Sequence, residues 1–330
     1  MGHFLITFDF KNILNQKLFN LSVNQHLTGL CLSMWQQIKN DIEHGNINAL
    51  ARCISLIENE VPGFDVLLQS LPASNTPVIG ITGPPGAGKS TLTDSLIGLL
   101  VEQQKKVAVL CVDPSSAFNL GALLGDRIRM SQWYNNPHVF IRSLATRGSL
   151  GGLHPKIIEI TDLLKFARFD FIIVETVGVG QSEIEIAGLA DVTVVTIVPE
   201  AGDEVQTMKA GLMEIADVFV VNKSDRPGAD LFVKNLRLML APAFSNHQQE
   251  VQIVKTSALN KEGITELLTA INMVLEQQGD NDKKAWLLAE KAYHLIQQYR
   301  MKDIKKETLK TELEQLKEGE NVYNYIRKYL

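Results

Sequence analysis

The chain has 330 residues and a net charge of −5, and its 45% hydrophobic and 21% charged residues are typical of an ordinary globular protein. Because charges of both signs are mixed, we expect neither a basic face for nucleic acid nor a polybasic membrane anchor. The sequence contains no run of 18 or more apolar residues, so no membrane-spanning helix is predicted. Cys31, Cys53 and Cys111 are isolated and lack C-x-x-C spacing. This usage indicates a reducing compartment, so we expect a cytoplasmic protein without a cysteine metal site.

The N-terminal part divides into two predicted segments. Residues 1–33 lack the positive start and continuous apolar core of a signal peptide, and one interpretation is an unstructured or artefactual extension before a true start at Met34. Residues 34–76 are predicted as a helical segment, with apolar residues at helical spacing on both sides of a break at Gly45. The stretch from Pro62 to Pro77 is rich in turn formers and is predicted to connect this segment to the first strand.

Residues 77–279 alternate short apolar runs with amphipathic stretches, which predicts an α/β fold with a mostly parallel sheet covered by helices on both faces. In such sheets the functional loops leave the C-terminal ends of the strands. The predicted strands are Val78–Thr82, Val107–Val112, Val139–Arg142, Phe171–Glu175, Val192–Val198, Val218–Asn222 and Gln252–Lys255.

The first strand runs into a sequence matching G-x-x-x-x-G-K-[ST], and a helical pattern follows it. Glycines let the backbone turn its N–H groups around a phosphate chain, Lys89 would reach the outer phosphates, and Ser90 would bind Mg²⁺. The alternative is a flexible glycine turn that happens to contain Lys-Ser, but strand and helix both stand in register with the motif. The predicted nucleotide-binding residues here are Gly83, Pro84, Pro85, Gly86, Ala87, Gly88, Lys89, Ser90 and Thr91.

Acidic residues follow two further strands. Asp113 ends the second strand, where it could hold Mg²⁺ directly or through water or could simply cap a turn, and spacing does not decide between these. The case for Asp126 at the metal is weaker still from the residues alone, since it could be an ordinary helix N-cap for the segment through Met130. Glu175 ends a very apolar strand and is predicted to point toward Mg²⁺ and its waters, with Gly178 placed to touch the γ-phosphate; a solvated strand-end glutamate is the alternative.

The sixth strand ends in Asn222-Lys223-Ser224-Asp225, which predicts guanine as the base. Asp225 would accept hydrogen bonds from N1–H and the exocyclic amine of guanine, whereas adenine would leave this carboxylate unpaired. Lys223 can lie along the base, and Asn222 can link this loop to the glycine loop. After the seventh strand, a backbone N–H within Ser257-Ala258-Leu259 can meet guanine O6, so GTP is favoured over ATP.

After Gly263 the pattern is helical to the end, and residues 280–330 carry apolar stripes at three-to-four-residue spacing. From the pattern alone, these stripes could cover the domain's own core or form a partner interface.

With these residues in view, the chain closely resembles the MeaB/ArgK/MMAA family of P-loop GTPases, which are chaperones of adenosylcobalamin-dependent methylmalonyl-CoA mutase. The resemblance runs from about Trp35 to about Ala289. The most specific pieces are Gly80 to Thr91, Val112 to Ser116, Leu124 to Met130, Arg147 to Gly152, Val174 to Glu183 and Ala201 to Glu204.

The resemblance implies that Lys89, Ser90, Asp113, Asp126 and Glu175 gather around Mg²⁺ and the phosphates of GTP, with Lys89, Asp126 and Glu175 as catalytic residues. It implies that residues 280–330 form a homodimer arm. It also implies that the partner is the mutase, with its cobalamin adenosyltransferase as a further candidate.

Two departures from the family pattern fall in the expected switch loop. Asn119-Leu120-Gly121 replaces a small-Gly-Gly string, and Arg127 stands where a lysine is usual. Two alternative functions stay open: a metal chaperone of the same GTPase class, disfavoured because no cysteine pair or histidine-rich tract is present, and a kinase linked to amino-acid uptake.

Overall fold

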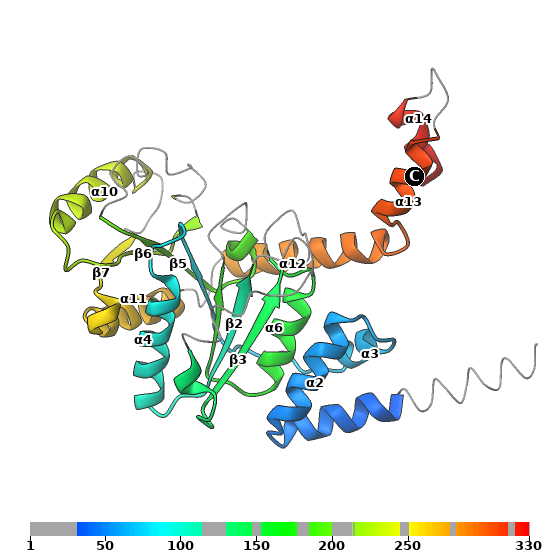
Figure 1. Ribbon diagram of the computed structural model, residues 1–330, viewed down its shortest axis with the longest axis horizontal. Helices are drawn as coiled ribbons and strands as arrows, with labels where there is room; N and C mark the ends of the chain where they lie inside the picture. The colour runs from blue at the N-terminus through cyan, green and yellow to red at the C-terminus, as the bar shows by residue number, and fades with distance from the viewer. Residues whose placement is uncertain are drawn as a thin grey trace, which may run out of the picture. The chain divides into compact units, whose positions relative to one another are not determined.

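The computed structural model describes residues 32–113, 130–146, 153–176, 185–199, 213, 215–244, 251–277, 282–315 and 321–329 (Figure 1). The chain divides into two compact units, residues 1–279 and 280–330. Asp126 and Gly178, and the departures at residues 119–121 and 127, lie outside the described residues. The same holds for residues 1–31, so the predicted N-terminal extension stays a prediction.

The first unit is built on one seven-stranded sheet in the order β3-β2-β4-β1-β5-β6-β7, and all six strand pairs are parallel. All seven predicted strands are present, and their ends differ from the predicted ones by at most three residues. The largest difference is at β3, where pairing with β2 continues to Ala145 opposite Asp113. The strands are β1 Val78–Thr82, β2 Val107–Asp113, β3 Val139–Ala145, β4 Phe171–Glu175, β5 Val192–Ile197, β6 Val218–Val221 and β7 Gln252–Lys255.

Helices cover both faces of this sheet, as the apolar strands require. On one face, α4 (Lys89–Glu102) and α11 (Ile264–Gln277) pack against alternate residues of the central strands. On the other face, α6 (Ile157–Phe166) covers the part formed by β2, β4 and β1, and α10 (Ala229–Phe244) covers β5 and β6. The predicted α/β architecture is therefore confirmed.

The helical N-terminal segment is part of the same hydrophobic core. Residues 32–43 and α2 (Ile47–Glu58) are helical and are separated by Gly45, whose φ of +83° lies in the left-handed region. Trp35 is 2% exposed, and its indole N–H donates to the Pro62 carbonyl at 2.9 Å. A short helix, α3 (Phe64–Gln69), follows, and α2 and α3 both contact α6.

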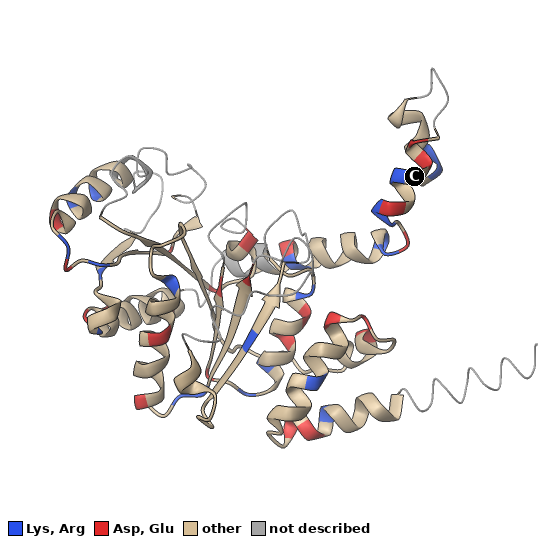
Figure 2. Ribbon diagram, in the orientation of Figure 1, with Lys and Arg blue, Asp and Glu red and all other residues tan. Residues whose placement is uncertain are grey.

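Three short 3₁₀ segments, η1 (Ser131–Trp133), η2 (Ile186–Gly188) and η3 (Ala258–Asn260), complete the described part of the first unit. Basic and acidic residues are intermixed along its helices (Figure 2). In the described part of the chain, no helix is both long enough and apolar enough to cross a bilayer.

The second unit is helical, with α12 (Asp282–Met301), α13 (Lys306–Leu313), α14 (Val322–Ile326) and the 3₁₀ turn η5 (Arg327–Tyr329). The carboxylate of Glu312 on α13 accepts hydrogen bonds from the hydroxyls of Tyr325 at 2.6 Å and Tyr329 at 3.2 Å, and it pairs with Lys328. These bonds hold the pKa of Glu312 below its usual value, with the Lys328 ammonium as the largest cause. Polar contacts therefore join the end of this unit to α13.

Candidate nucleotide-binding site

The glycine loop lies between β1 and α4, at the C-terminal edge of the central strand. Gly83, Gly86 and Gly88 have φ angles of +136°, +78° and +88°, which side-chain-bearing residues rarely adopt. At Gly83 a Cβ atom would lie 2.0 Å from the backbone oxygen of Thr196 on β5, so the loop passes directly over the neighbouring strand. The backbone angles favour glycine at all three positions, and at Gly83 the neighbouring strand also leaves no space for a side chain.

Lys89 is the first residue of α4 and is buried, and its ammonium group turns back into the loop. Its Nζ donates to the carbonyl oxygens of Gly83 at 2.8 Å and Pro84 at 3.0 Å. A cation held by carbonyls at a helix N-terminus is placed to exchange those acceptors for phosphate oxygens. The role of Lys89 at the outer phosphates stays a prediction.

Glu175 ends β4 and is 4% exposed, and α4 supplies donors to both of its carboxylate oxygens. The Ser90 hydroxyl donates to Oε1 at 2.6 Å, and the Thr93 hydroxyl lies 3.0 Å from Oε2. The alternative of a solvated glutamate at this strand end is therefore not what the structure shows. The carboxylate is held instead against the helix that follows the glycine loop.

Asp113 ends the neighbouring strand β2, and it is 8% exposed. Since Cys111 is paired with Glu175 across the two strands, Asp113 lies one side-chain repeat further along the same edge. Ser90, Asp113 and Glu175 offer only oxygen atoms, which are the ligands that Mg²⁺ prefers. Within the described ranges, no group of three or more His, Cys, Asp or Glu side chains could hold a metal ion.

At the base end of the site, Asn222 joins three segments. It is 2% exposed, and its amide nitrogen donates to the Ala87 carbonyl of the glycine loop at 2.9 Å. Its Oδ1 accepts from the Thr256 hydroxyl and from the Ala258 N–H, both at 3.1 Å. The predicted link from Asn222 to the glycine loop is present. The Ala258 N–H is one of the three N–H groups predicted to meet guanine O6, and in this structure it donates to Asn222 Oδ1 instead.

Asp225 and Ser257 meet across the loops that follow β6 and β7. The Ser257 hydroxyl donates to Asp225 Oδ1 at 2.7 Å, and this bond is the main cause that holds the pKa of Asp225 below its usual value. An ionised carboxylate has two acceptor oxygens, which is what two guanine N–H groups require. Lys223 has a left-handed φ of +56°, and Leu259 is 86% exposed.

Sequence reasoning missed three hydroxyl contacts that support this site. The first is the Thr93 hydroxyl at Glu175 Oε2. The second is the Ser95 hydroxyl on α4, which donates to the Ala258 carbonyl at 2.7 Å, and the third joins the hydroxyls of Thr82 and Thr176, which lie 2.8 Å apart. The available signal was the position of Thr93, which falls one helical turn after Lys89 and Ser90 and so on the same helix face. The partners of Ser95 and Thr82 are far away in the sequence and left no such signal.

Comparison with known proteins assigns the family. A family model described as methylmalonyl Co-A mutase-associated GTPase MeaB matches residues 50–312, which include every described strand and the whole glycine loop. The chain belongs to this MeaB family. It is accordingly a GTPase, and the predicted family resemblance is confirmed.

Individual MeaB relatives agree with this assignment. A putative GTPase of Pyrococcus horikoshii is 45% identical over 246 residues, 72% of this chain and 78% of that protein. GTPase ArgK of Escherichia coli is 38% identical over 241 residues, covering 70% and 72% of the two chains. The mouse methylmalonic aciduria type A homolog, mitochondrial, is 40% identical over 196 residues, 57% of this chain and 46% of the mouse protein.

Among solved structures, the structure of a LAO/AO transport system kinase is similar to that of this MeaB-family chain. The TM-score is 0.62 and the identity 29%, with 90% of each chain covered. This similarity supports the P-loop GTPase fold that the sheet order and the glycine loop already show.

Proposed function

We propose that this chain is a Mg²⁺-dependent GTPase that gates delivery of adenosylcobalamin to methylmalonyl-CoA mutase, or to a related acyl-CoA mutase, and protects that mutase from inactivation. The observation that carries the proposal is the MeaB family match, because it spans both the phosphate end and the base end of the site. The mutase appears in the description of that family. The isolated cysteines favour the cytoplasm as the compartment.

In the proposed reaction, water attacks the γ-phosphate of GTP in line, and catalysis rests on positioning and charge neutralisation. Lys89 would leave the loop carbonyls and bind the outer phosphates. Ser90 and Asp113 would bind Mg²⁺, which neutralises phosphate charge when it is bound, and Glu175 would orient its water. Asp126 and Gly178 keep their predicted roles at the metal and the γ-phosphate as part of this proposal.

The experiment uses a tagged full-length chain and a purified adenosylcobalamin-dependent mutase. We expect the two to co-purify, and we expect the active lifetime of the mutase during turnover to lengthen with GTP but not with GDP. Lys89→Ala is the matched control, since it removes the phosphate contact and should cancel the GTP effect. Absence of any effect of the wild-type chain on the mutase would contradict the proposal.

A second candidate function is a kinase acting in amino-acid uptake, favoured by the similarity to the LAO/AO transport system kinase. Incubation with GTP labelled at the γ-phosphate separates the two functions. A labelled protein product would support the kinase, whereas release of labelled inorganic phosphate alone supports the hydrolase. The metal-chaperone alternative would be revived by tight stoichiometric binding of a metal other than Mg²⁺.

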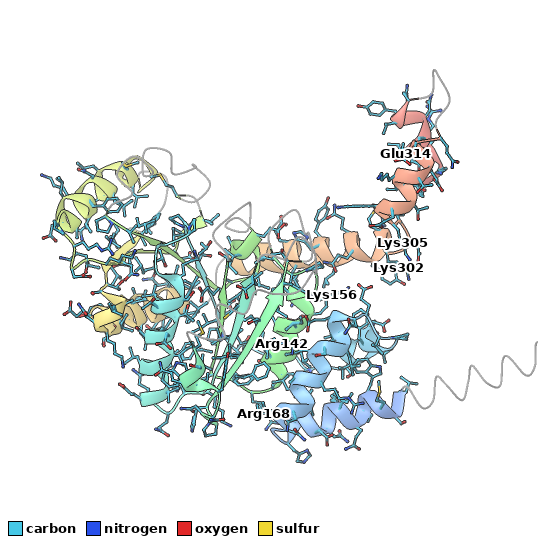
Figure 3. The ribbon with its side chains drawn as sticks, viewed as in Figure 1. Arg142, Lys156, Arg168, Lys302, Lys305 and Glu314 are labelled. Carbon is cyan, nitrogen blue, oxygen red and sulfur yellow. The ribbon has the colours of Figure 1, made fainter. Side chains whose placement is uncertain are left out.

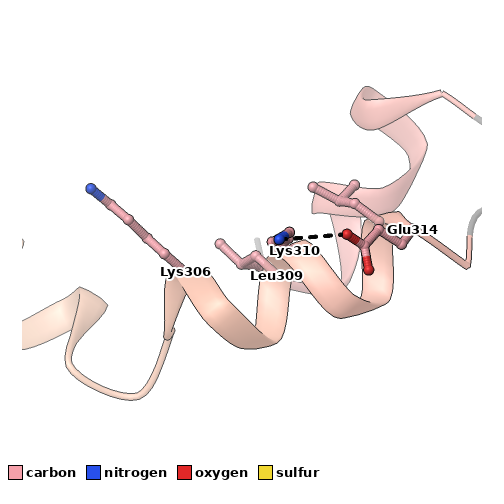
Figure 4. Close-up of a pocket in the computed structure, with 5 residues that line it drawn as sticks. Lys306, Leu309, Lys310 and Glu314 are labelled. Carbon is pink, nitrogen blue, oxygen red and sulfur yellow. Dashed lines mark ion pairs between the residues drawn. The ribbon is translucent and has the colours of Figure 1, made fainter.

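We also propose that residues 280–330 form a homodimer arm. None of the described side chains in this unit that are apolar is buried, and Leu288, Tyr293, Ile296 and Tyr299 on α12 are each more than half exposed. On α13, Leu309 and Leu313 line a shallow pocket with Lys306, Lys310 and Glu314, and Lys310 pairs with Glu314 at 3.8 Å (Figure 4). A helical segment of this length needs an apolar surface to pack against, and a second copy of the chain supplies one.

A further inference from the structure

Thr93 is a buried polar residue on α4 whose position is not explained by nucleotide binding alone. It follows Ser90 by one helical turn and is fully buried. Its hydroxyl lies 3.0 Å from the Lys89 carbonyl oxygen and 3.0 Å from Glu175 Oε2. A hydroxyl has one proton, so Thr93 can donate fully to only one of these two acceptors.

The carboxylate is the stronger of the two acceptors. Glu175 is almost entirely buried, and a buried carboxylate needs donors to compensate for its lost hydration. Hydrogen bonds to an ionised acceptor are roughly twice as strong as those between neutral groups. The Lys89 carbonyl lies within α4, whose Thr93 N–H serves it as a helical donor, so the carbonyl depends less on this hydroxyl.

The two hydroxyls of α4 act on different oxygens of the same carboxylate. Ser90 binds Oε1 at 2.6 Å and Thr93 binds Oε2 at 3.0 Å, from positions three residues apart on one helix face. Two donors on different oxygens constrain the plane of the carboxylate more than either donor does by itself. The helix that follows the glycine loop therefore sets the direction in which Glu175 faces.

We infer that Thr93 is a positioning residue for Glu175, holding its carboxylate toward the Mg²⁺ bound by Ser90. This inference rests on the proposed metal role of Glu175. The competing explanation is structural: Thr93 would serve only to satisfy a helix carbonyl in the core. The two explanations differ in whether the hydroxyl affects Mg²⁺ binding or only folding stability.

Thr93→Val tests this inference, because valine keeps the shape and removes the hydroxyl, and Thr93→Ser is the matched control that keeps the hydroxyl. The readout is the Mg²⁺ concentration at which the full-length chain retains half of a fluorescent GDP analogue. For Thr93→Val we expect this midpoint to rise roughly tenfold, the scale of one hydrogen bond to a charged group. For Thr93→Ser we expect it to stay within about twofold.

Other results separate the possible failures. An unchanged midpoint in Thr93→Val, with or without lower stability in urea, would overturn the inference and leave the proposed function standing. GDP retention by the wild type that does not depend on Mg²⁺ would overturn the metal role of Glu175 and the inference with it. If Thr93→Val does not fold, Thr93→Ala is measured in the same way and carries the same expectation.

Discussion

Gly83 and Gly86 show how backbone geometry and steric space act separately in the same loop. Both have positive φ angles, +136° and +78°. A Cβ at Gly83 would meet the Thr196 backbone oxygen at 2.0 Å, but a Cβ at Gly86 would have nothing within 4 Å. A side chain at either position would therefore strain the backbone, but only a side chain at Gly83 would also collide with β5.

We predict that Gly86→Ala lowers the free energy of unfolding by about 1 kcal/mol and Gly83→Ala by about 3 kcal/mol or more, measured by urea unfolding without nucleotide. The excess in Gly83→Ala reflects displacement of β5 backbone, which cannot move aside as a flexible side chain can. Equal losses in the two variants would show that the loop relaxes away from Thr196.

In the proposed site Asp225 would select the base, and the Ser257 hydroxyl in the neighbouring loop donates to its carboxylate at 2.7 Å. We predict that Asp225→Asn weakens GTP binding by about a hundredfold or more and improves binding of xanthosine triphosphate, because the amide can donate to the C2 carbonyl of xanthine. Nucleotide titration by fluorescence checks both.

Asp230→Asn is the control for this prediction. Asp230 pairs with Lys255 at 2.8 Å on the protein surface, and we expect its substitution to leave both affinities unchanged. Unchanged GTP affinity in Asp225→Asn would refute the assignment of the base loop.

At the scale of elements, the N-terminal helices are joined to the sheet by charge as well as by apolar packing. Arg142 lies on β3 (Figure 3). It pairs with Glu58 at the end of α2, and it also donates to the Ser55 hydroxyl at 3.0 Å. The side chains of Glu58 and Arg142 are 11% and 24% exposed. The Nε2 atom of the buried His154, just before α6, lies 3.8 Å from Oε1 of Glu58.

We predict that Glu58→Gln lowers the free energy of unfolding by about 2 kcal/mol, because it leaves the largely buried Arg142 guanidinium without its counter-charge. Glu43→Gln is the matched control, since the Glu43–Arg168 pair is 45% and 74% exposed and should contribute less than about 0.5 kcal/mol. Urea unfolding measures both variants. A loss in Glu58→Gln no larger than that in the control would mean that apolar packing alone holds α2.

At the scale of the whole molecule, the proposed homodimer depends on the apolar residues of the second unit. We predict that the double variant Leu309→Lys with Leu313→Lys is a monomer, since it places charge in an apolar contact that the dimer would bury. Light scattering coupled to size exclusion measures the mass. Glu307→Lys, an exposed change on the same helix, should leave a dimer, and a monomeric wild type would contradict the proposal.

Strands β1, β2, β4, β5 and β6 were predictable because each is an apolar run between turn-forming residues, with nearly every residue buried in this fold. The edge strand β7 is only partly buried, and its prediction rested on its place in the alternation of strands and helices. The glycine loop was predictable because its chemistry is carried by consecutive residues. The Thr93 contact left a signal only in its spacing from Ser90, and the contacts of Ser95 and the Glu58–Arg142 pair left none, because a hydroxyl or a charge on a helix has no visible partner until the strands pair. The register that brings Glu175 beside α4 comes from contacts between residues more than 80 positions apart.

The sequence by itself thus determined the α/β sheet and the GTPase family, and it supplied the residues predicted to bind phosphate and guanine, since local patterns and motifs encode these directly. The tertiary structure decided how those residues are held: Lys89 by the loop carbonyls, Asn222 by the glycine loop, and Glu175 by two hydroxyls of one helix. The physical reason is that a motif specifies chemical groups along the chain, whereas the direction of a buried polar group is set by donors and acceptors that folding brings to it.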